Sequence, residues 1–417
     1  MKKLKILHIS TFDRGGASAV IRLHHYLLKK GLESDYLTID DFNKNVLRKH
    51  IYKPISEKNT FMDRIKSKLG LKNPHSFYDQ QGIQIEGYPL GYGFTFPQTL
   101  NKDICKLPIF KQADIIHLHW VNKMIDYPSF FDECKKPIVW TLHDMHPFTG
   151  GLYYSIGTNY TENQLVKYIT PETNSLDKLL NQHTKIKAKA VENSKIEVAA
   201  TSSMMKKLSE NSVILGKFKH HLIPLGIDTD IFRPYSKKLA RNVFGLKEHG
   251  MVLVFVSAQV DNRFKGLSAL TESLRYLPAD IQILAVGNES KNLQDSHRNI
   301  KFTGTIYDER LMALAYSAGD LFVTPSLQEA FGQTTIEAQA CGVPVLAFQT
   351  WGSADLVENR RTGMITKETT VEALAENILD VHAGKIVFDS QYIREQAVEK
   401  YDLTNYISGY LKLYDSF

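Results

Sequence analysis

The sequence predicts an α/β protein with two domains, each a parallel sheet flanked by helices. At 417 residues the chain is too long for a single hydrophobic core. Short apolar runs alternate with helix-like segments, with glycine or proline at the junctions, which is the pattern of parallel strands and crossover helices. The clearest example is segment 321–348, where a strand, a loop, a helix and a second strand follow one another directly.

The boundaries of these elements can be assigned from the residues of 321–348. The apolar run 321–323 is typical of a short buried strand, and Pro325 ends it because proline cannot continue a central strand. A helix is expected over 333–341, with Gly342 as its C-cap. Residues 345–348 form the next apolar run, which completes a βαβ unit.

Two carboxylates lie in this unit, Glu329 in the loop and Glu337 on the helix. Open α/β sheets bind ligands at the carboxyl ends of their strands, and the first-turn N–H groups at Gly332 and Gln333 can hold a phosphate. Carboxylates tolerate a neighbouring anion when they face hydroxyls, as they would with a nucleotide sugar. The structural alternatives are a carboxylate complementing the helix dipole, for Glu329, and a solvated helix charge, for Glu337.

The run EAFGQTTIEAQACGVPV resembles the E-x7-E signature of the retaining glycosyltransferases of family 4. The resemblance implies the GT-B fold, with two Rossmann-like domains facing across a cleft. It implies that Glu337 binds the donor ribose hydroxyls and that Glu329 contacts the transferred sugar. The residues that would hold the sugar and diphosphate with Glu329 are Ala330, Phe331, Gly332 and Gln333.

The first half of the chain carries a similar strand–loop–helix start. The first-half strands are expected at 5–10, 33–39, 113–120, 137–142 and 196–201. Gly15 and Gly16 follow the first of these strands and precede a helix over 18–30. Because glycine has no side chain, the backbone of this loop can approach a phosphate closely. This loop resembles the family's G-G-A loop, so Gly15 and Gly16 are expected at the donor diphosphate.

Four histidines occur within thirty residues. His117 and His119 share one strand face, and His143 and His146 follow the next strand. Strand-end spacing without a cysteine or carboxylate cluster is weak support for a metal site, so none is expected. The strand resembles the family's V-x-T-x-H, which implies that His143 faces the reacting sugar and acceptor. HDMHPFTGG (143–151) resembles a branch acting on cell-surface polysaccharides, although the cysteines that often follow there are absent.

The segment 221–234 resembles the family's interdomain linker, with two prolines and a glycine suited to a hinge. We therefore expect an acceptor domain over 1–223 and a nucleotide-sugar domain over 224–398. In GT-B proteins the last helix crosses back to the first domain, and 399–417 is expected to do so.

The second domain begins with a strand at 251–257, followed by a loop that carries Lys265. The resemblance implies that Lys265 neutralises the donor diphosphate. The family's strand-end arginine is replaced here by Gln259 and Val260, so Arg263 is expected to supply that charge from within the loop. Ile306, after a strand at 300–304, is expected where the family grips the base with its backbone.

Charge is unevenly distributed along the chain. Residues 1–223 carry a net charge of +11 and residues 224–417 one of −5, within a total of +6. A basic half suggests an anionic partner: a membrane surface, a lipid diphosphate or nucleic acid. An ordinary solvated surface is the alternative. Segment 61–72 is predicted to be a basic amphipathic helix suited to a membrane surface or to packing on its own domain. A second basic patch is expected at Lys185, Lys187 and Lys189.

The remaining composition points to a cytoplasmic protein. The three cysteines, Cys105, Cys134 and Cys341, are few and scattered, which fits a reducing compartment. No signal peptide and no apolar run of membrane-spanning length are evident. No nucleic-acid-binding module is recognised, so nucleic acid is not an expected partner. Peripheral contact with the cytoplasmic face of the membrane stays open.

The function implied by the resemblance is a retaining, NDP-sugar-dependent glycosyltransferase in bacterial surface polysaccharide synthesis. The donor would be of UDP or GDP type, and the acceptor a glycan or lipid-linked glycan. Catalysis is expected without cofactor or metal, because no Asp-x-Asp motif begins a donor loop. The expected catalytic residues are His143, Lys265, Arg263 and Glu329. The alternatives are a GT-B nucleotide-sugar epimerase and a catalytically weak or non-enzymatic nucleotide-sugar-binding protein.

Overall fold

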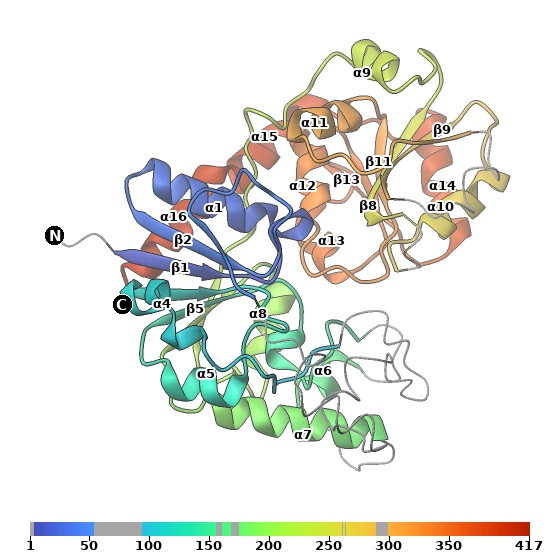
Figure 1. The fold of residues 1–417 in the computed structure, drawn as a ribbon. Helices are drawn as coiled ribbons and strands as arrows, with labels where there is room; N and C mark the ends of the chain where they lie inside the picture. The colour runs from blue at the N-terminus through green and yellow to red at the C-terminus, as the bar shows by residue number, and fades with distance from the viewer. Residues whose placement is uncertain are drawn as a thin grey trace, which may run out of the picture. The chain divides into compact units, whose positions relative to one another are not determined.

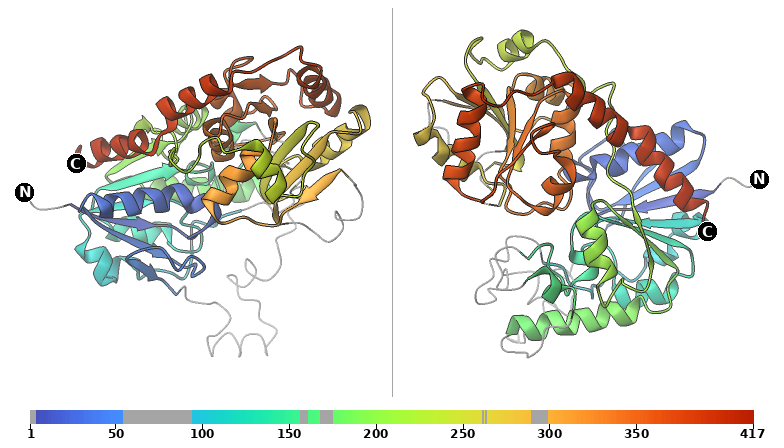
Figure 2. Two further views of the ribbon diagram at one scale, coloured as in Figure 1. Left: turned by 90° about the horizontal axis from the view of Figure 1, so that it is seen from above. Right: turned by 180° about the vertical axis from the view of Figure 1, so that it is seen from behind.

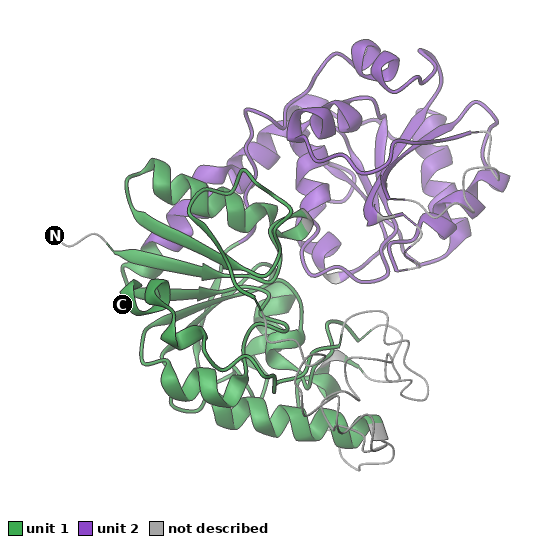
Figure 3. Cartoon of the chain, viewed as in Figure 1, with its two compact units in different colours: residues 1–223, 412–417 green, residues 224–411 purple. Residues whose placement is uncertain are grey.

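The computed structural model describes residues 4–53, 94–155, 161–167, 175–260, 262, 264–288 and 299–417 (Figure 1). The predicted basic segment 61–72 and Arg263 lie outside these residues. The chain divides into two compact units, with residues 1–223 and 412–417 in unit 1 and residues 224–411 in unit 2 (Figure 3).

Unit 1 is a seven-stranded, fully parallel sheet with helices around it. Its strands are β1 (Lys5–Ile9), β2 (Glu33–Thr38), β3 (Lys49–Ile51), β4 (Ile115–Leu118), β5 (Ile138–Leu142), β6 (Ile196–Ala200) and β7 (Lys219–Leu222). Their spatial order is β3-β2-β1-β4-β5-β6-β7. The order reverses between β1 and β4, which is the topological switch point where doubly wound sheets bind ligands.

The α-helices described for unit 1 are α1 (Ser18–Lys29), α4 (Pro108–Gln112), α5 (Tyr127–Glu133), α6 (Glu162–Leu165), α7 (Ser175–Ala190) and α8 (Ser203–Glu210). The central strands are buried on both faces, as their continuous apolar sequences predict. The last residues of the chain also pack here, because the Tyr414 hydroxyl lies 2.7 Å from His117 Nδ1 in β4. Figure 2 shows the end of the chain against this sheet.

Unit 2 repeats the architecture with six parallel strands. These are β8 (Val252–Gln259), β9 (Gln282–Asn288), β10 (Ile300–Phe302), β11 (Leu321–Thr324), β12 (Val345–Ala347) and β13 (Gly363–Ile365). Their order is β10-β9-β8-β11-β12-β13, so the switch point lies between β8 and β11. The helices assigned to it are α9 (Lys237–Val243), α10 (Leu267–Ser273), α11 (Glu309–Ser317), α12 (Gln333–Ala340), α13 (Trp351–Leu356), α14 (Val371–His382), α15 (Ser390–Tyr401) and α16 (Leu403–Tyr414), of which α16 runs into the residues grouped with unit 1.

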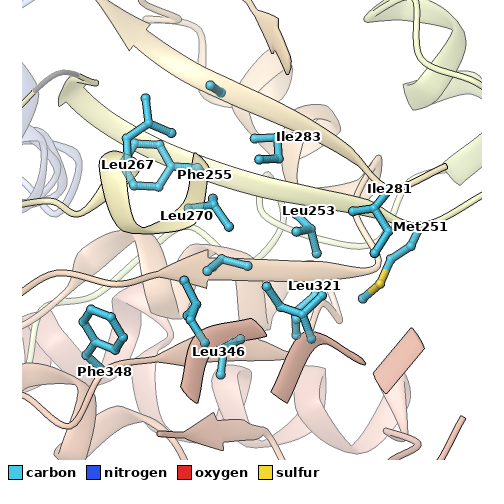
Figure 4. Close-up of a cluster of buried hydrophobic side chains, with 14 of the residues drawn as sticks. Met251, Leu253, Phe255, Leu267, Leu270, Ile281, Ile283, Leu321, Leu346 and Phe348 are labelled. Carbon is cyan, nitrogen blue, oxygen red and sulfur yellow. The ribbon is translucent and has the colours of Figure 1, made fainter. Parts of the chain in front are cut away.

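The core of unit 2 lies between the sheet and the helices on one of its faces (Figure 4). Leu253 and Phe255 from β8 pack with Leu267 and Leu270 from α10, and Leu346 from β12 joins the same cluster. Burying an aliphatic or aromatic side chain of this size contributes about 1.5–3 kcal/mol. This packing fixes the strand ends that carry the candidate site.

The sequence prediction was wrong about Lys187. Lys185, Lys187 and Lys189 were expected to form one basic surface patch, yet Lys187 is fully buried on α7. Residues two apart on a helix point to nearly opposite sides, so the three lysines cannot share one face. Lys187 Nζ donates to the carbonyl oxygens of His146 and Thr149 at 2.6 and 3.1 Å.

Candidate functional site

In unit 2, two loops meet at the switch point between β8 and β11. The loop after β8 carries Lys265, and the loop after β11 carries Glu329. The Leu327 N–H donates to the Phe264 carbonyl at 2.9 Å, and a Cβ added to Gly266 would lie 2.1 Å from the Pro325 carbonyl oxygen. Gly266 has φ +80°, so both its backbone angle and this close approach require glycine.

The two loops bring Lys265 and Glu329 together. Lys265 Nζ lies 2.5 Å from Glu329 Oε2, with 33% and 19% of the two side chains exposed. Sequence reasoning predicted both residues at the site but not their ion pair. The structure therefore places one half-buried cation and one carboxylate side by side at the carboxyl edge of the sheet.

Glu337 lies on α12, and it is not a solvated helix charge. Its side chain is buried at 6% exposure. Gln333 Nε2 donates to Oε1 at 2.7 Å, and the Tyr316 hydroxyl donates to Oε2 at 2.9 Å. Buried carboxylates are rare unless they are hydrogen-bonded, and each oxygen can still accept a further donor such as a sugar hydroxyl.

The helix that carries Glu337 begins at the same loop. Gly332 is its N-cap, with φ +99° and no capping side chain, so the first-turn N–H groups point toward the loop without a side-chain acceptor from that cap. Ala330 and Phe331 are buried at 3% and 4% exposure, which holds this loop in place. The Lys265 ammonium and the N–H groups at the start of this helix could together bind an anion.

The structure also places two other positions of unit 2 that the sequence analysis considered. Val260 is fully buried in the core, so its position supplies packing where the family resemblance expected an arginine. Ile306 is partly buried after β10, at the same edge of the sheet.

In unit 1, the loops after β1, β4 and β5 meet at the other switch point. Trp120 follows β4 and stacks on His143, with ring centroids 4.0 Å apart and planes at 21°. A Cβ on Gly16 would lie 3.1 Å from Trp120 Cη2, so the glycine loop approaches the same indole. The structure thus places two predicted residues, Gly16 and His143, beside one tryptophan that sequence reasoning did not select.

Asp144 anchors this arrangement. Its carboxylate accepts from Trp120 Nε1 at 2.8 Å, and from the backbone N–H of His146 at 2.9 Å; His146 Nδ1 lies 2.7 Å away. Burial alone would raise the pKa of Asp144, but the interactions with His146 and Trp120 outweigh it and lower that pKa. Burial lowers the pKa of His143 to about 4, an effect that Asp144 only partly offsets.

Behind His143 lies a group of buried histidines. Nitrogens of His8, His117 and His119 lie within 4.8 Å of one another, close enough for the three rings to hold a metal ion. His117 Nδ1 contacts the Tyr414 hydroxyl and its Nε2 contacts the Thr141 hydroxyl, both at 2.7 Å. Sequence reasoning placed His117 and His119 on one face but missed His8, because it comes from a strand over a hundred residues away.

A family model and several curated proteins match part of the chain. Residues 250–383 match the family model described as "Glycosyl transferases group 1". D-inositol 3-phosphate glycosyltransferase of Mycobacteroides abscessus is 32% identical over an alignment of 168 positions that covers 37% of each chain. The same-named protein of Segniliparus rotundus is 33% identical over an alignment of 186 positions that covers 40% of each chain. The alignments thus span about two fifths of these curated relatives.

Solved structures resemble nearly the whole chain. Sucrose-phosphate synthase of Thermosynechococcus elongatus aligns with a TM-score of 0.65 at 20% identity, covering 99% of both chains. HepE of Anabaena, solved in complex with UDP and glucose, aligns with a TM-score of 0.65 at 16% identity, covering 99% of this chain and 100% of that one. The chain has the GT-B fold, and its residues 250–383 match the group 1 glycosyl transferase model.

Proposed function

We propose that the protein is a retaining glycosyltransferase that moves a sugar from a nucleoside-diphosphate sugar to a hydroxyl acceptor. The arrangement of Lys265, Glu329 and Glu337 at the switch point of unit 2 carries this proposal. A cation and a helix start suit a diphosphate, and a buried, hydrogen-bonded carboxylate suits ribose hydroxyls. These residues fall inside the segment that matches the group 1 glycosyl transferase model.

The donor is proposed to be a UDP-sugar, with a GDP-sugar as the second candidate. Support for UDP comes from HepE, which was solved with UDP and with UDP-glucose. Lys265 would stabilise negative charge building on the leaving diphosphate, a preorganised electrostatic contribution of the kind that typically changes rates by about 10²–10³. Glu329 would release Lys265 to the phosphate and contact the transferred sugar.

Two acceptor classes are proposed for testing. The names of the curated relatives point to an inositol phosphate, and the HDMHPFTGG segment points to a glycan or lipid-linked glycan of a bacterial surface polysaccharide. No helix in the described part of the chain is both long enough and apolar enough to cross a bilayer. Peripheral contact with the cytoplasmic face of a membrane is proposed from the net charge of +11 over residues 1–223.

A catalytically weak, nucleotide-sugar-binding protein is the second candidate. Val260 is buried in the core at a position where the family resemblance expects an arginine. The described residues after β8 therefore provide a single cation, Lys265, beside Glu329. A site with less positive charge would bind the donor yet stabilise the leaving group less.

Donor hydrolysis separates these candidates. The protein is incubated with UDP- and GDP-sugars, without acceptor and with or without EDTA, and free sugar is followed by NMR. The glycosyltransferase is expected to release sugar slowly, with the donor's anomeric configuration in the first product and without loss in EDTA. Lys265→Met should abolish release, whereas Lys237→Met, which removes another ion-paired lysine of unit 2, should not. An epimerised nucleotide sugar, or binding without release, would contradict the proposal.

A further inference from the structure

A chain of hydrogen-bonded histidine rings runs from the core of unit 1 to His143. His8 Nδ1 lies 3.1 Å from His119 Nε2, and His119 Nδ1 lies 3.1 Å from His143 Nε2. His8 and His119 are 0% and 1% exposed, while His143 is partly exposed. The far end of the chain, His8 Nε2, is buried and has no hydrogen-bond partner among the described residues.

The number of protons on these rings restricts their arrangement. Burial holds the pKa of His8 and His119 well below the usual value, so each ring is neutral and carries one N–H near pH 7. A neutral imidazole donates from one nitrogen and accepts at the other. His119 therefore either accepts from His8 and donates to His143, or accepts from His143 and donates to His8.

The two arrangements leave different groups at the two ends. If His119 donates to His143, then His8 Nε2 is an unprotonated nitrogen and His143 carries its proton on Nδ1. If His119 donates to His8, then His8 Nε2 carries a buried N–H with no acceptor, and His143 Nδ1 is unprotonated. Buried backbone N–H groups without an acceptor are rarer in proteins than under-satisfied backbone carbonyls, and the same preference, applied to the imidazole nitrogen of His8, favours the first arrangement.

We propose that His8 and His119 are positioning residues that hold His143 with its proton on Nδ1, so that His143 meets the substrate as a hydrogen-bond donor. This inference rests on the proposed function for the identity of the substrate, but the tautomer itself is a property of the free protein. A donor suits a hydroxyl or ring oxygen of the sugar or acceptor. It does not suit a general base, which needs an unprotonated nitrogen facing the attacking hydroxyl.

Neighbouring contacts hold the rings in these positions. Trp120 covers one face of His143 and is itself fixed by Asp144, which limits rotation of the imidazole. His117 packs beside His119 with centroids 4.0 Å apart and ring planes at 36°, and both of its nitrogens have hydroxyl partners. The rings of His8, His119 and His143 therefore keep the spacing that a hydrogen-bonded chain requires.

The first test is the tautomer of His143 in the unliganded protein. Long-range ¹H–¹⁵N NMR of histidine-labelled protein distinguishes protonated from unprotonated ring nitrogens, and His143→Asn identifies the resonances of His143. Protonated Nδ1 and unprotonated Nε2 are expected near pH 7. Protonated Nε2 would overturn the proposal. No substrate is needed, so this outcome is independent of whether sugar transfer is found.

Two substitutions separate a positioning role from a role in the core. His119→Phe keeps a buried ring but removes the donor to His143, so both tautomers of His143 should appear in the spectrum. His183→Phe is the matched control, because His183 is also buried in unit 1 and bonds the Gly150 carbonyl, outside the chain of rings. It should leave the His143 tautomer unchanged. An unchanged spectrum in His119→Phe would contradict the proposal.

Turnover measurements on variants of His143 and His119 test the functional role. His143→Asn places an amide N–H near the position of Nδ1, and it should retain about tenfold more turnover than His143→Ala, the effect of one hydrogen bond. His119→Phe should lower kcat about tenfold in the wild type and have little effect in the His143→Asn background. Equal loss in both backgrounds would indicate a structural role alone and would overturn the inference.

Metal binding is the competing explanation for the same cluster. An ion held by His8, His117 and His119 would need the unprotonated nitrogen of each ring, whereas in the proposed chain the unprotonated Nε2 of His119 already accepts from His8. Zinc added to the protein, or removed with EDTA, should therefore leave the His143 resonances unchanged. Stoichiometric zinc that shifts them would replace the proposed chain with a metal site.

Discussion

Lys265 Nζ and Glu329 Oε2 lie 2.5 Å apart at the carboxyl edge of the unit 2 sheet. Their loops are joined by the hydrogen bond from Leu327 to Phe264 and by the close approach of Gly266 to Pro325. The ion pair holds the lysine side chain at the site before a phosphate binds. Without the carboxylate, the lysine could turn toward solvent. The ion pair is thus the link between the fold of unit 2 and the proposed donor site.

Lys265→Met is expected to weaken nucleoside-diphosphate binding by about 10- to 100-fold, the range of one hydrogen bond to a charged group. The change also leaves Glu329 unpaired next to an anion. Isothermal titration with UDP and GDP measures the effect. Lys237→Met, in an ion pair with Asp320 elsewhere in unit 2, should bind as the wild type does. If the two variants bind with equal affinity, Lys265 does not contact the diphosphate.

Gly266→Ala should destabilise the protein far more than Gly304→Ala. Both glycines have left-handed backbone angles, φ +80° and +71°, so both substitutions carry a cost of about 1 kcal/mol or more. A Cβ at Gly266 would collide with the Pro325 carbonyl, whereas nothing lies within 4 Å of one at Gly304. Thermal melting compares the two. A similar loss for both would show that the loops after β8 and β11 are not held in close contact.

Gly16→Ala is expected to lower turnover several-fold, and its nucleotide affinity reports whether Gly16 also lies at the donor diphosphate, as the family resemblance implies. The new Cβ would lie 3.1 Å from Trp120 Cη2, and Trp120 stacks on His143. Displacing the indole by a few tenths of an ångström moves the imidazole, and small misplacements at a reacting centre reduce rates. Steady-state kinetics with a binding titration as control measures both quantities. Weakened nucleotide binding would place Gly16 at the donor diphosphate as well, whereas unchanged turnover would contradict the prediction.

Stability should fall as the pH drops from about 6.5 to 4. Burial lowers the pKa of His24 and of His183 from 6.5 to about 4 in the folded protein. The unfolded chain therefore binds these protons first, and each group reduces stability by up to about 1.4 kcal/mol per pH unit across this window. Melting temperatures between pH 7 and 4 test this. His183→Phe should give a shallower decline, and a flat profile would contradict the assigned burial.

Much of the fold could be predicted from the sequence because central parallel strands are continuous apolar runs. Strands β1, β5 and β11 were expected close to their observed limits. Strands β3 and β7 were not, since their sequences KHI and KHHL are polar and they lie at the two edges of the sheet. An edge strand is only partly buried, so it leaves little hydrophobic signal.

The candidate site also has a part that could be predicted from the sequence and a part that could not. Glu329 and Glu337 could be predicted because their loop and helix are contiguous in sequence. The partners that define their environment could not: Tyr316 reaches Glu337 from α11, and Lys265 reaches Glu329 across sixty-four positions. Likewise His8 and Trp120 join His143 only through the pairing of β1, β4 and β5. Contacts made by sheet register have no local sequence pattern.

The most direct test of the nucleotide site in unit 2 is thermal melting of the wild type and Glu337→Ala with UDP, GDP, ADP and CMP. A ligand at 100 times its dissociation constant adds about 2.7 kcal/mol of stability. We expect one diphosphate to raise the wild-type midpoint and Glu337→Ala to lose that rise, because Glu337 would hold the ribose. If no nucleotide raises the wild-type midpoint, or if Glu337→Ala responds as the wild type does, the proposed donor site is wrong.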